Sequence, residues 1–175
     1  MPSSIKAVIT HSSRQTISLG VKLAKELSRI PFKKGALVVA LQGELGSGKT
    51  TFLQGFAKGL GIKEKILSPT FIILRKFEIR NSKSLPTGDL PKGDETNSKS
   101  KIQRPKTFYH IDAYRLKSAC DLYELGWNEI IKDPQNIIVV EWADRVRGAM
   151  SRDAVWIRFR WCGEAEREIR VNKIN

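Results

Sequence analysis

The sequence predicts an α/β fold in which helices flank a mostly parallel central sheet and an antiparallel hairpin lies at the C-terminal end. Two continuous apolar runs, residues 36–41 and 137–140, are typical of strands that are buried on both faces. The stretch 51–60 between them carries apolar residues at helical spacing. Two alternating segments joined around Gly163 have the pattern of an antiparallel hairpin.

Length and composition favour one intracellular domain. At 175 residues the chain can bury one sizeable core, and we expect a single domain over 1–175. No segment approaches the roughly 20 apolar residues of a membrane helix, and the N-terminus lacks a signal-peptide apolar region. We therefore expect a soluble, cytoplasmic protein. Cys120 and Cys162 lack CxxC spacing, so each should be a partly buried apolar residue and not a zinc ligand or half of a disulfide.

The first elements carry clear local signals. Residues 5–10 have the pattern of a short strand, and Ser12 or Ser13 can cap the helix that follows, whose apolar stripe includes Leu23 and Leu27. That helix ends in the segment 31–35. The later expected elements are strands at 71–79, 108–112 and 137–140, a helix at 121–131, and hairpin strands at 154–160 and 168–171.

A polar stretch at 81–106 interrupts this pattern. It is rich in Ser, Lys, Pro, Gly, Asn and Asp, has no aromatic residue, and holds only Leu85, Leu90 and Ile102 as large aliphatic residues. So little apolar surface cannot offset the entropy cost of ordering the segment. We expect a flexible insertion within the domain.

The most informative motif is the loop at 43–50, which reads Gly-Glu-Leu-Gly-Ser-Gly-Lys-Thr and fits GxxxxGK[ST], the phosphate-binding P-loop. It lies between an apolar strand and a helix, which is the order that a P-loop requires. Lys49 would reach the β- and γ-phosphates of a nucleotide, and the Thr50 hydroxyl would bind Mg²⁺. The alternative is a glycine-rich turn that binds nothing. The pattern therefore predicts a P-loop NTPase-like fold.

Two acidic residues follow apolar strands, where ligands collect in open α/β sheets. A P-loop enzyme needs one acid to hold Mg²⁺ and often another to orient the attacking water, and either Asp112 or Glu141 can take either part. Each could instead cap a turn. Thr70, in a Ser-Pro-Thr loop, is a further candidate that would sense the γ-phosphate, although such a segment is also an ordinary turn into a strand.

The chain is strongly basic, with 31 Lys and Arg against 18 Asp and Glu and a formal net charge of +13. Lys and Arg contacts to phosphates supply most non-specific affinity for nucleic acid, so RNA is one candidate partner. A generally basic surface that aids solubility or meets an acidic protein is the other reading. The basic residues are scattered along the chain, and charge alone does not separate the two.

Several motifs together resemble the bacterial TsaE proteins, also called YjeE. Beyond the loop at 43–51, they are Ser-Pro-Thr-Phe at 68–71, Tyr-His-Ile-Asp-Ala-Tyr-Arg-Leu at 109–116, Glu-Leu-Gly at 124–126 and Val-Glu-Trp at 140–142. The resemblance implies an ATPase that uses Mg²⁺ and works with the TsaB and TsaD proteins in making N6-threonylcarbamoyladenosine at position 37 of tRNAs that read ANN codons. By the same resemblance tRNA is a candidate partner, directly or through that complex.

The resemblance also implies roles for single residues. Lys49 and Thr50 would bind phosphate and Mg²⁺, Thr70 would belong to a switch-like loop, Asp112 would be the Walker-B-type acid, and Glu141 the acid needed for hydrolysis. Trp142 would help to shape the nucleotide pocket, or else would be a core residue. The catalytic set is then Glu141, Lys49 and Thr70, and the metal set Thr50, Asp112 and Glu141. The nucleotide-binding set is Gly43, Glu44, Leu45, Gly46, Ser47, Gly48, Lys49, Thr50, Thr51 and Trp142.

The insertion at 81–106 departs from the short connection that is usual in this family, and three other functions are compared with the ATPase. Small-molecule kinases share the loop pattern but need a lid that supplies arginines, and the insertion contains only Arg104. No NKxD motif for guanine is present, which disfavours a GTPase. The non-enzymatic alternative is a basic RNA-binding accessory protein. ATP binding would hold it in one conformation, and it would not hydrolyse the ATP.

Overall fold

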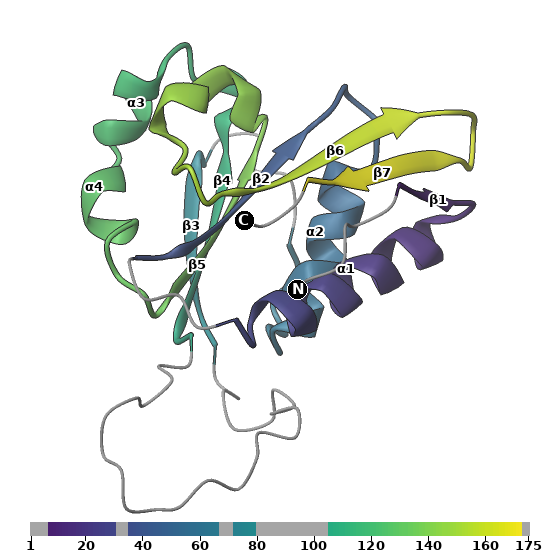
Figure 1. Cartoon of the computed structure of the whole chain (residues 1–175), viewed down its shortest axis with the longest axis horizontal. Helices are drawn as coiled ribbons and strands as arrows, with labels where there is room; N and C mark the ends of the chain where they lie inside the picture. Colours follow the sequence, from purple (N-terminus) through teal and green to yellow (C-terminus); the bar gives the residue numbers. More distant parts are fainter. Residues whose placement is uncertain (1–6, 31–34, 67–71, 80–104, 173–175) are drawn as a thin grey trace, which may run out of the picture.

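In the part of the chain that the structure describes, a seven-stranded sheet has helices on both of its faces (Figure 1). The computed structural model describes residues 7–30, 35–66, 72–79 and 105–172. Across the sheet the strand order is β1-β7-β6-β2-β5-β4-β3. The strands are β1 Val8–Thr10, β2 Leu37–Gln42, β3 Leu74–Glu78, β4 Thr107–Asp112, β5 Asn136–Glu141, β6 Val155–Trp161 and β7 Arg167–Val171.

The centre of the sheet is parallel and its two margins are antiparallel. Strands β6, β2, β5 and β4 run parallel to one another. In contrast, β3 pairs with β4, β7 with β6, and β1 with β7 in antiparallel fashion. This arrangement confirms the predicted α/β class, the parallel core and the C-terminal hairpin, which is β6–β7. Strand β5 is buried along its whole length, as a strand covered on both faces must be.

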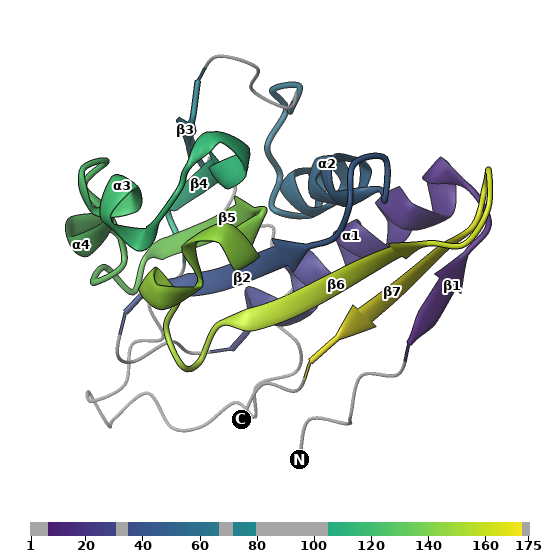
Figure 2. The same cartoon turned by 90° about the horizontal axis from the view of Figure 1, so that it is seen from above.

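Among the described residues, two helices cover one face of the sheet and four short helices cover the other. Figure 2 shows these two layers on either side of the strands. Helices α1 (Ser13–Leu27) and α2 (Lys49–Gly59) form the first layer. The second layer holds α3 (Ala119–Tyr123), α4 (Trp127–Ile130) and the 3-10 helices η1 (Ala113–Arg115) and η2 (Ala143–Ala149). None of the helices in the described ranges has the length and apolar character that crossing a membrane requires.

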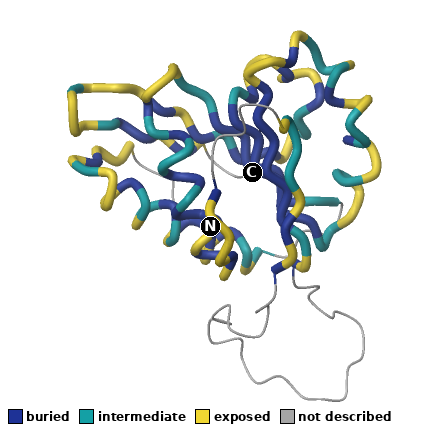
Figure 3. Tube along the Cα trace, turned by 180° about the vertical axis from the view of Figure 1, so that it is seen from behind, coloured by how far each residue is buried: buried dark blue, intermediate teal, exposed yellow. Residues whose placement is uncertain are grey.

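The alternation of side chains along the central strands separates two hydrophobic cores. In β2, Leu37, Val39 and Leu41 face α1 and α2, whereas Val38 and Ala40 face the short helices. The central strands are buried, whereas the turn of the β6–β7 hairpin is mostly exposed (Figure 3). Both cores lie against the strands that carry the loop at 43–50 and Glu141, so the fold holds these two segments rigidly.

Several local expectations need correction. The helix expected over 121–131 is two short helices, because Gly126 adopts a left-handed conformation with φ of 80° between α3 and α4. Both cysteines are exposed and not partly buried. Thr70 lies outside the described residues. So does the expected insertion at 81–106 apart from its last two residues, and its flexibility stays a prediction.

Glycines let α1 and α2 approach each other closely. A Cβ atom added to Gly55 would lie 2.1 Å from the backbone oxygen of Ile17, and one added to Gly20 would lie 2.3 Å from the backbone oxygen of Phe52. Neither backbone can move without shifting its whole helix. Because α2 begins directly at the P-loop, this contact also fixes the position of the loop relative to α1.

We expect Gly55→Ala to lower the free energy of unfolding by about 1–3 kcal/mol, because the added methyl group forces α1 and α2 apart. Denaturant unfolding followed by circular dichroism measures the change. Gly148→Ala is the matched control, since its Cβ would lie 3.6 Å from the Cβ of Ala119, an ordinary contact. Equal stability of the two variants would contradict the close helix contact.

Candidate nucleotide-binding site

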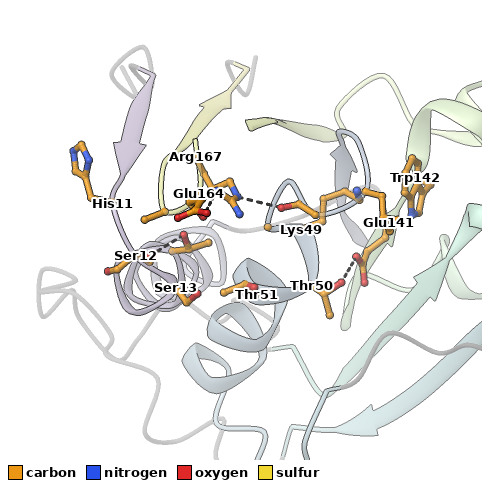
Figure 4. A pocket seen from close by; sticks show the side chains of 15 residues that line it. His11, Ser12, Ser13, Lys49, Thr50, Thr51, Glu141, Trp142, Glu164 and Arg167 are labelled. Carbon is orange, nitrogen blue, oxygen red and sulfur yellow. Dashed lines mark hydrogen bonds between the residues drawn. The ribbon is translucent and has the colours of Figure 1, made fainter. Parts of the chain in front are cut away.

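A pocket of about 480 Å³ lies where the carboxyl ends of β2 and β5 meet the N-terminus of α2 (Figure 4). Three segments far apart in the sequence line it: the start of α1, the P-loop with the first turn of α2, and the turn of the β6–β7 hairpin. Glu141 and Trp142 close its remaining side. Its volume falls within the usual range for small-molecule sites.

The P-loop has the backbone geometry that phosphate binding requires. Gly43, with φ of 152°, has no room for a side chain, because a Cβ would lie 2.6 Å from the backbone oxygen of Phe159. Gly48, with φ of 98°, is the N-cap of α2, and no side chain caps this helix. The backbone N–H groups of the first turn of α2 therefore remain available to an anion, and the helix dipole favours one there.

Lys49 is held against the loop itself. Its Nζ donates hydrogen bonds of 2.7 Å to the backbone oxygens of both Gly43 and Glu44, and lies 3.8 Å from the centroid of the Trp142 ring. Only 5% of the residue is exposed. This burial lowers the pKa of the Lys49 ammonium below its ordinary value, although the carboxylates of Glu141 and Asp112 oppose the shift.

Glu141 is a buried carboxylate with a separate partner on each oxygen. The Thr50 hydroxyl donates a hydrogen bond of 2.8 Å to Oε2, and the Nε2 atom of His110 lies 2.9 Å from Oε1. Glu141 is 1% exposed and His110 is fully buried. Two partners fix the plane of the carboxylate and reduce the cost of burying its charge.

Trp142 has a strained backbone beside the site. Its φ of 58° makes it the one described residue other than glycine with a positive φ. The ring contacts both Lys49 and Tyr114, whose ring centroid is 5.1 Å away, and the guanidinium carbon of Arg145 lies 5.0 Å from the Tyr114 centroid. The left-handed turn directs the chain away from β5 and presents the indole to the pocket.

Asp112 lies beside Glu141 at the end of the neighbouring strand. The two are paired in the register of β4 and β5, and Asp112 is 8% exposed. One of its carboxylate oxygens accepts a hydrogen bond from the backbone N–H of Tyr114 in η1.

The described part of the chain holds no cluster of three or more His, Cys, Asp or Glu side chains that would bind a metal ion without other ligands. A Mg²⁺ ion here would depend on the Thr50 hydroxyl, adjacent acids, water and nucleotide phosphates, as is usual for this ion.

The structure brings most of the expected site residues together. Leu45, Gly46, Gly48, Lys49, Thr50, Thr51, Glu141 and Trp142 line the pocket. Gly43, Glu44 and Ser47 form the loop behind these residues, and Asp112 lies at the same edge of the sheet. Thr70 is outside the described residues, so its part in the site stays a prediction.

Sequence reasoning missed two walls of the pocket and the partner of Glu141. His11, Ser13 and Thr16 contribute from the start of α1, where the sequence signalled only a helix cap. Arg167 contributes from β7, and its Nε donates to the backbone oxygen of Gly46 at 3.1 Å. No local motif marks these residues. His110 lies within the motif at 109–116, but no function was predicted for it.

The family can now be assigned. The family model described as threonylcarbamoyl adenosine biosynthesis protein TsaE matches residues 10–169. The chain belongs to the TsaE family. It is 32% identical to a tRNA threonylcarbamoyladenosine biosynthesis protein TsaE of Treponema pallidum, over 93% of this chain and 97% of that protein. The TsaE protein of Bacillus subtilis is 33% identical over 79% of this chain and 70% of its own length.

A solved structure supports the fold. The crystal structure of Bacillus subtilis YdiB aligns with a TM-score of 0.63 and 26% sequence identity, covering 99% of this chain and 89% of that one. The resemblance to the TsaE family and the predicted fold class are therefore confirmed. The roles of single residues in this chain stay predictions.

The hydrogen bond between Thr50 and Glu141 gives a prediction for the unliganded protein. We expect Thr50→Val to lower the free energy of unfolding by about 1–3 kcal/mol, because a buried carboxylate oxygen loses its partner. Thr51→Val is the control, since the structure gives the neighbouring Thr51 hydroxyl no hydrogen bond to a described residue. Urea unfolding without nucleotide compares them. Equal stabilities would show that the bond to Glu141 contributes nothing.

Proposed function

We propose that this chain is a Mg²⁺-dependent ATPase that serves the biosynthesis of threonylcarbamoyladenosine in tRNA. The observation that carries the proposal is the alignment of Lys49, Thr50 and Glu141 in one pocket at the uncapped N-terminus of α2. A cation, a hydroxyl and a buried carboxylate are the side chains that phosphoryl transfer to water needs. The membership of the TsaE family and the names of its relatives support the pathway.

The residues present fit a nucleotide with Mg²⁺. The Ser47 hydroxyl oxygen is buried and has no hydrogen-bond partner in the described structure, and the backbone N–H groups at the start of α2 are uncapped. Lys49 would exchange the backbone oxygens of Gly43 and Glu44 for phosphate oxygens, and the Thr50 hydroxyl would turn from Glu141 to the metal ion. When bound, Mg²⁺ would screen the charge of the β- and γ-phosphates.

Glu141 would then act on water. Its Oε2 atom, released by Thr50, would accept a hydrogen bond from a water molecule and orient that water toward the terminal phosphate. Asp112, paired with Glu141 in the sheet register, would hold the metal ion through its water shell. The part of the pocket between the start of α1 and the hairpin turn would receive the base and ribose.

The energy of ATP would be used outside this chain. Lys49, Thr50 and Glu141 share the pocket at the P-loop, whereas a second described pocket, which Gln54, Lys58 and residues 61–66 line, contains none of these three. We therefore propose that hydrolysis changes the conformation of a complex with TsaB and TsaD, with tRNA bound to the complex or touching this basic chain directly. A cytoplasmic location belongs to the same proposal, because tRNA is the molecule to be modified.

We expect Lys49→Ala to lower kcat/KM for ATP hydrolysis by about 100-fold or more, because it deletes the charge that faces the phosphates. A steady-state phosphate-release assay with Mg²⁺ measures the loss. Lys58→Ala is the control, since Lys58 lies in the last turn of α2, outside this pocket. Hydrolysis by the Lys49→Ala variant at the rate of the control would exclude the P-loop as the site. A protein that binds ATP tightly but hydrolyses it no faster than the Lys49→Ala variant, with or without partners, would not be an ATPase. It would be the non-enzymatic accessory protein, which changes conformation on binding ATP.

We expect Glu141→Gln to bind Mg-ATP and its partners but to fail in repeated rounds of tRNA modification with TsaB and TsaD. The amide keeps the shape of the carboxylate but cannot orient water as a base, so at most one round would be completed. Counting modified tRNA per protein molecule tests this, with Asp112→Asn expected to weaken metal-dependent nucleotide binding instead. Many rounds by Glu141→Gln, or by the partners without this chain, would refute the proposed role. The reverse behaviour of the two variants would exchange the roles of the two acids.

A further inference from the structure

His110 is a fully buried histidine that the proposed reaction has not yet used. It lies in the middle of β4 with no exposed surface, and its Nε2 atom is 2.9 Å from Oε1 of Glu141. A histidine is an unusual choice for a strand whose other side chains on this face include Phe108. An apolar residue would fill the same space without a polar atom to satisfy.

The sheet register brings the two side chains together. His110 pairs with Val139 across β4 and β5, and Glu141 is two residues beyond Val139 on the same face. The contact is therefore diagonal, within the reach that neighbouring strands allow for long side chains. Thr50 approaches the same carboxylate from the first turn of α2. Glu141 is thus held from two independent elements, β4 and α2.

The direction of the hydrogen bond follows from the chemistry of the partners. The proposed role of Glu141 requires an ionised carboxylate, which only accepts hydrogen bonds, so in this scheme the Nε2–H group of His110 donates to Oε1. The other ring nitrogen, Nδ1, is buried and has no partner within the described structure. A buried nitrogen without a hydrogen-bond partner lowers the free energy of unfolding. Packing alone would favour an apolar residue at this position, so the contact with Glu141 is what the imidazole contributes.

We propose that His110 is the positioning residue of Glu141 during ATP hydrolysis, an inference that rests on the function proposed above. When the Thr50 hydroxyl turns to the metal ion, Glu141 loses the partner of Oε2. The bond from His110 to Oε1 then holds the carboxylate plane and leaves Oε2 directed at water. His110 touches neither nucleotide nor water in this scheme, since it acts through Glu141 alone.

We expect His110→Phe to lower kcat about 10–100-fold, which is the usual effect of removing a group that orients a functional side chain. The dissociation constant for Mg-ADP should not change. His110→Gln should recover part of kcat, because its amide N–H can donate near the position of Nε2. Phosphate release and calorimetry measure the two quantities. The matched control is Phe108→Leu, a buried change on the same face of β4 that should lower stability and leave kcat intact.

A measurement without nucleotide tests the same hydrogen bond. The chain has only two histidines, so proton–nitrogen NMR can assign both rings by comparing the protein with His110→Gln. We expect His110 to show a protonated Nε2 with slow exchange and the exposed His11 to exchange rapidly. Glu141→Ala should alter the ring signals of His110 and leave those of His11 unchanged. An Nδ1-protonated His110 would overturn the inference.

A double variant separates this inference from the proposed function. If His110 acts through Glu141, His110→Phe should lower kcat no further when Glu141 is already Gln. Full activity of His110→Phe beside an inactive Glu141→Gln would overturn the role of His110 and leave the ATPase intact. Full activity of Glu141→Gln would instead contradict the catalytic role of Glu141. The positioning role of His110 would then be contradicted as well, because it acts through Glu141. Loss of Mg-ADP binding in His110→Phe, but not in Phe108→Leu, would also contradict a role in positioning alone.

Discussion

The parallel pairing of β2, β5 and β4 is the constraint on which the site depends. The register sets Leu41 opposite Glu141 and Glu141 opposite Asp112, so the P-loop and both acids emerge at one edge of the sheet. Buried side chains on both faces of these strands fix that register, because a shift by one residue would exchange the faces of every side chain. The same alternation directs His110 and Glu141 to the side that α2 covers.

The functional side chains Lys49, Thr50 and Glu141 have partners within the protein before any ligand arrives. Lys49 is bonded to backbone oxygens and lies against Trp142, and Thr50 is bonded to Glu141. Binding of Mg-ATP in the proposed scheme is therefore an exchange of partners. New contacts to phosphate and metal must be stronger than those they replace, and only this difference favours the bound state. In that scheme the exchange couples the bound nucleotide to the position of Glu141.

The hairpin and α1 complete the pocket from outside the P-loop unit. Arg167 on β7 donates to the backbone oxygens of Gly46 and Gly163, which connects the loop to the hairpin turn. The N-terminus of α1 is brought to the same place by the close contact of Gly20 and Gly55 with the facing helix. Both walls thus depend on antiparallel and helix–helix contacts that are separate from the parallel core. A change in either wall would alter the pocket without altering Lys49 or Thr50.

The sequence by itself determined the fold class, the P-loop, and the acids at strand ends, because each depends on local spacing: apolar runs, glycines, and an acid directly after a strand. It did not reveal the break at Gly126, where one residue's backbone conformation overrides a helical pattern. Nor did it reveal that His110 binds Glu141, or that Arg167 reaches Gly46. The tertiary structure decided these contacts, because they join residues 31 and 121 positions apart whose meeting depends on strand order and register, which local periodicity does not encode.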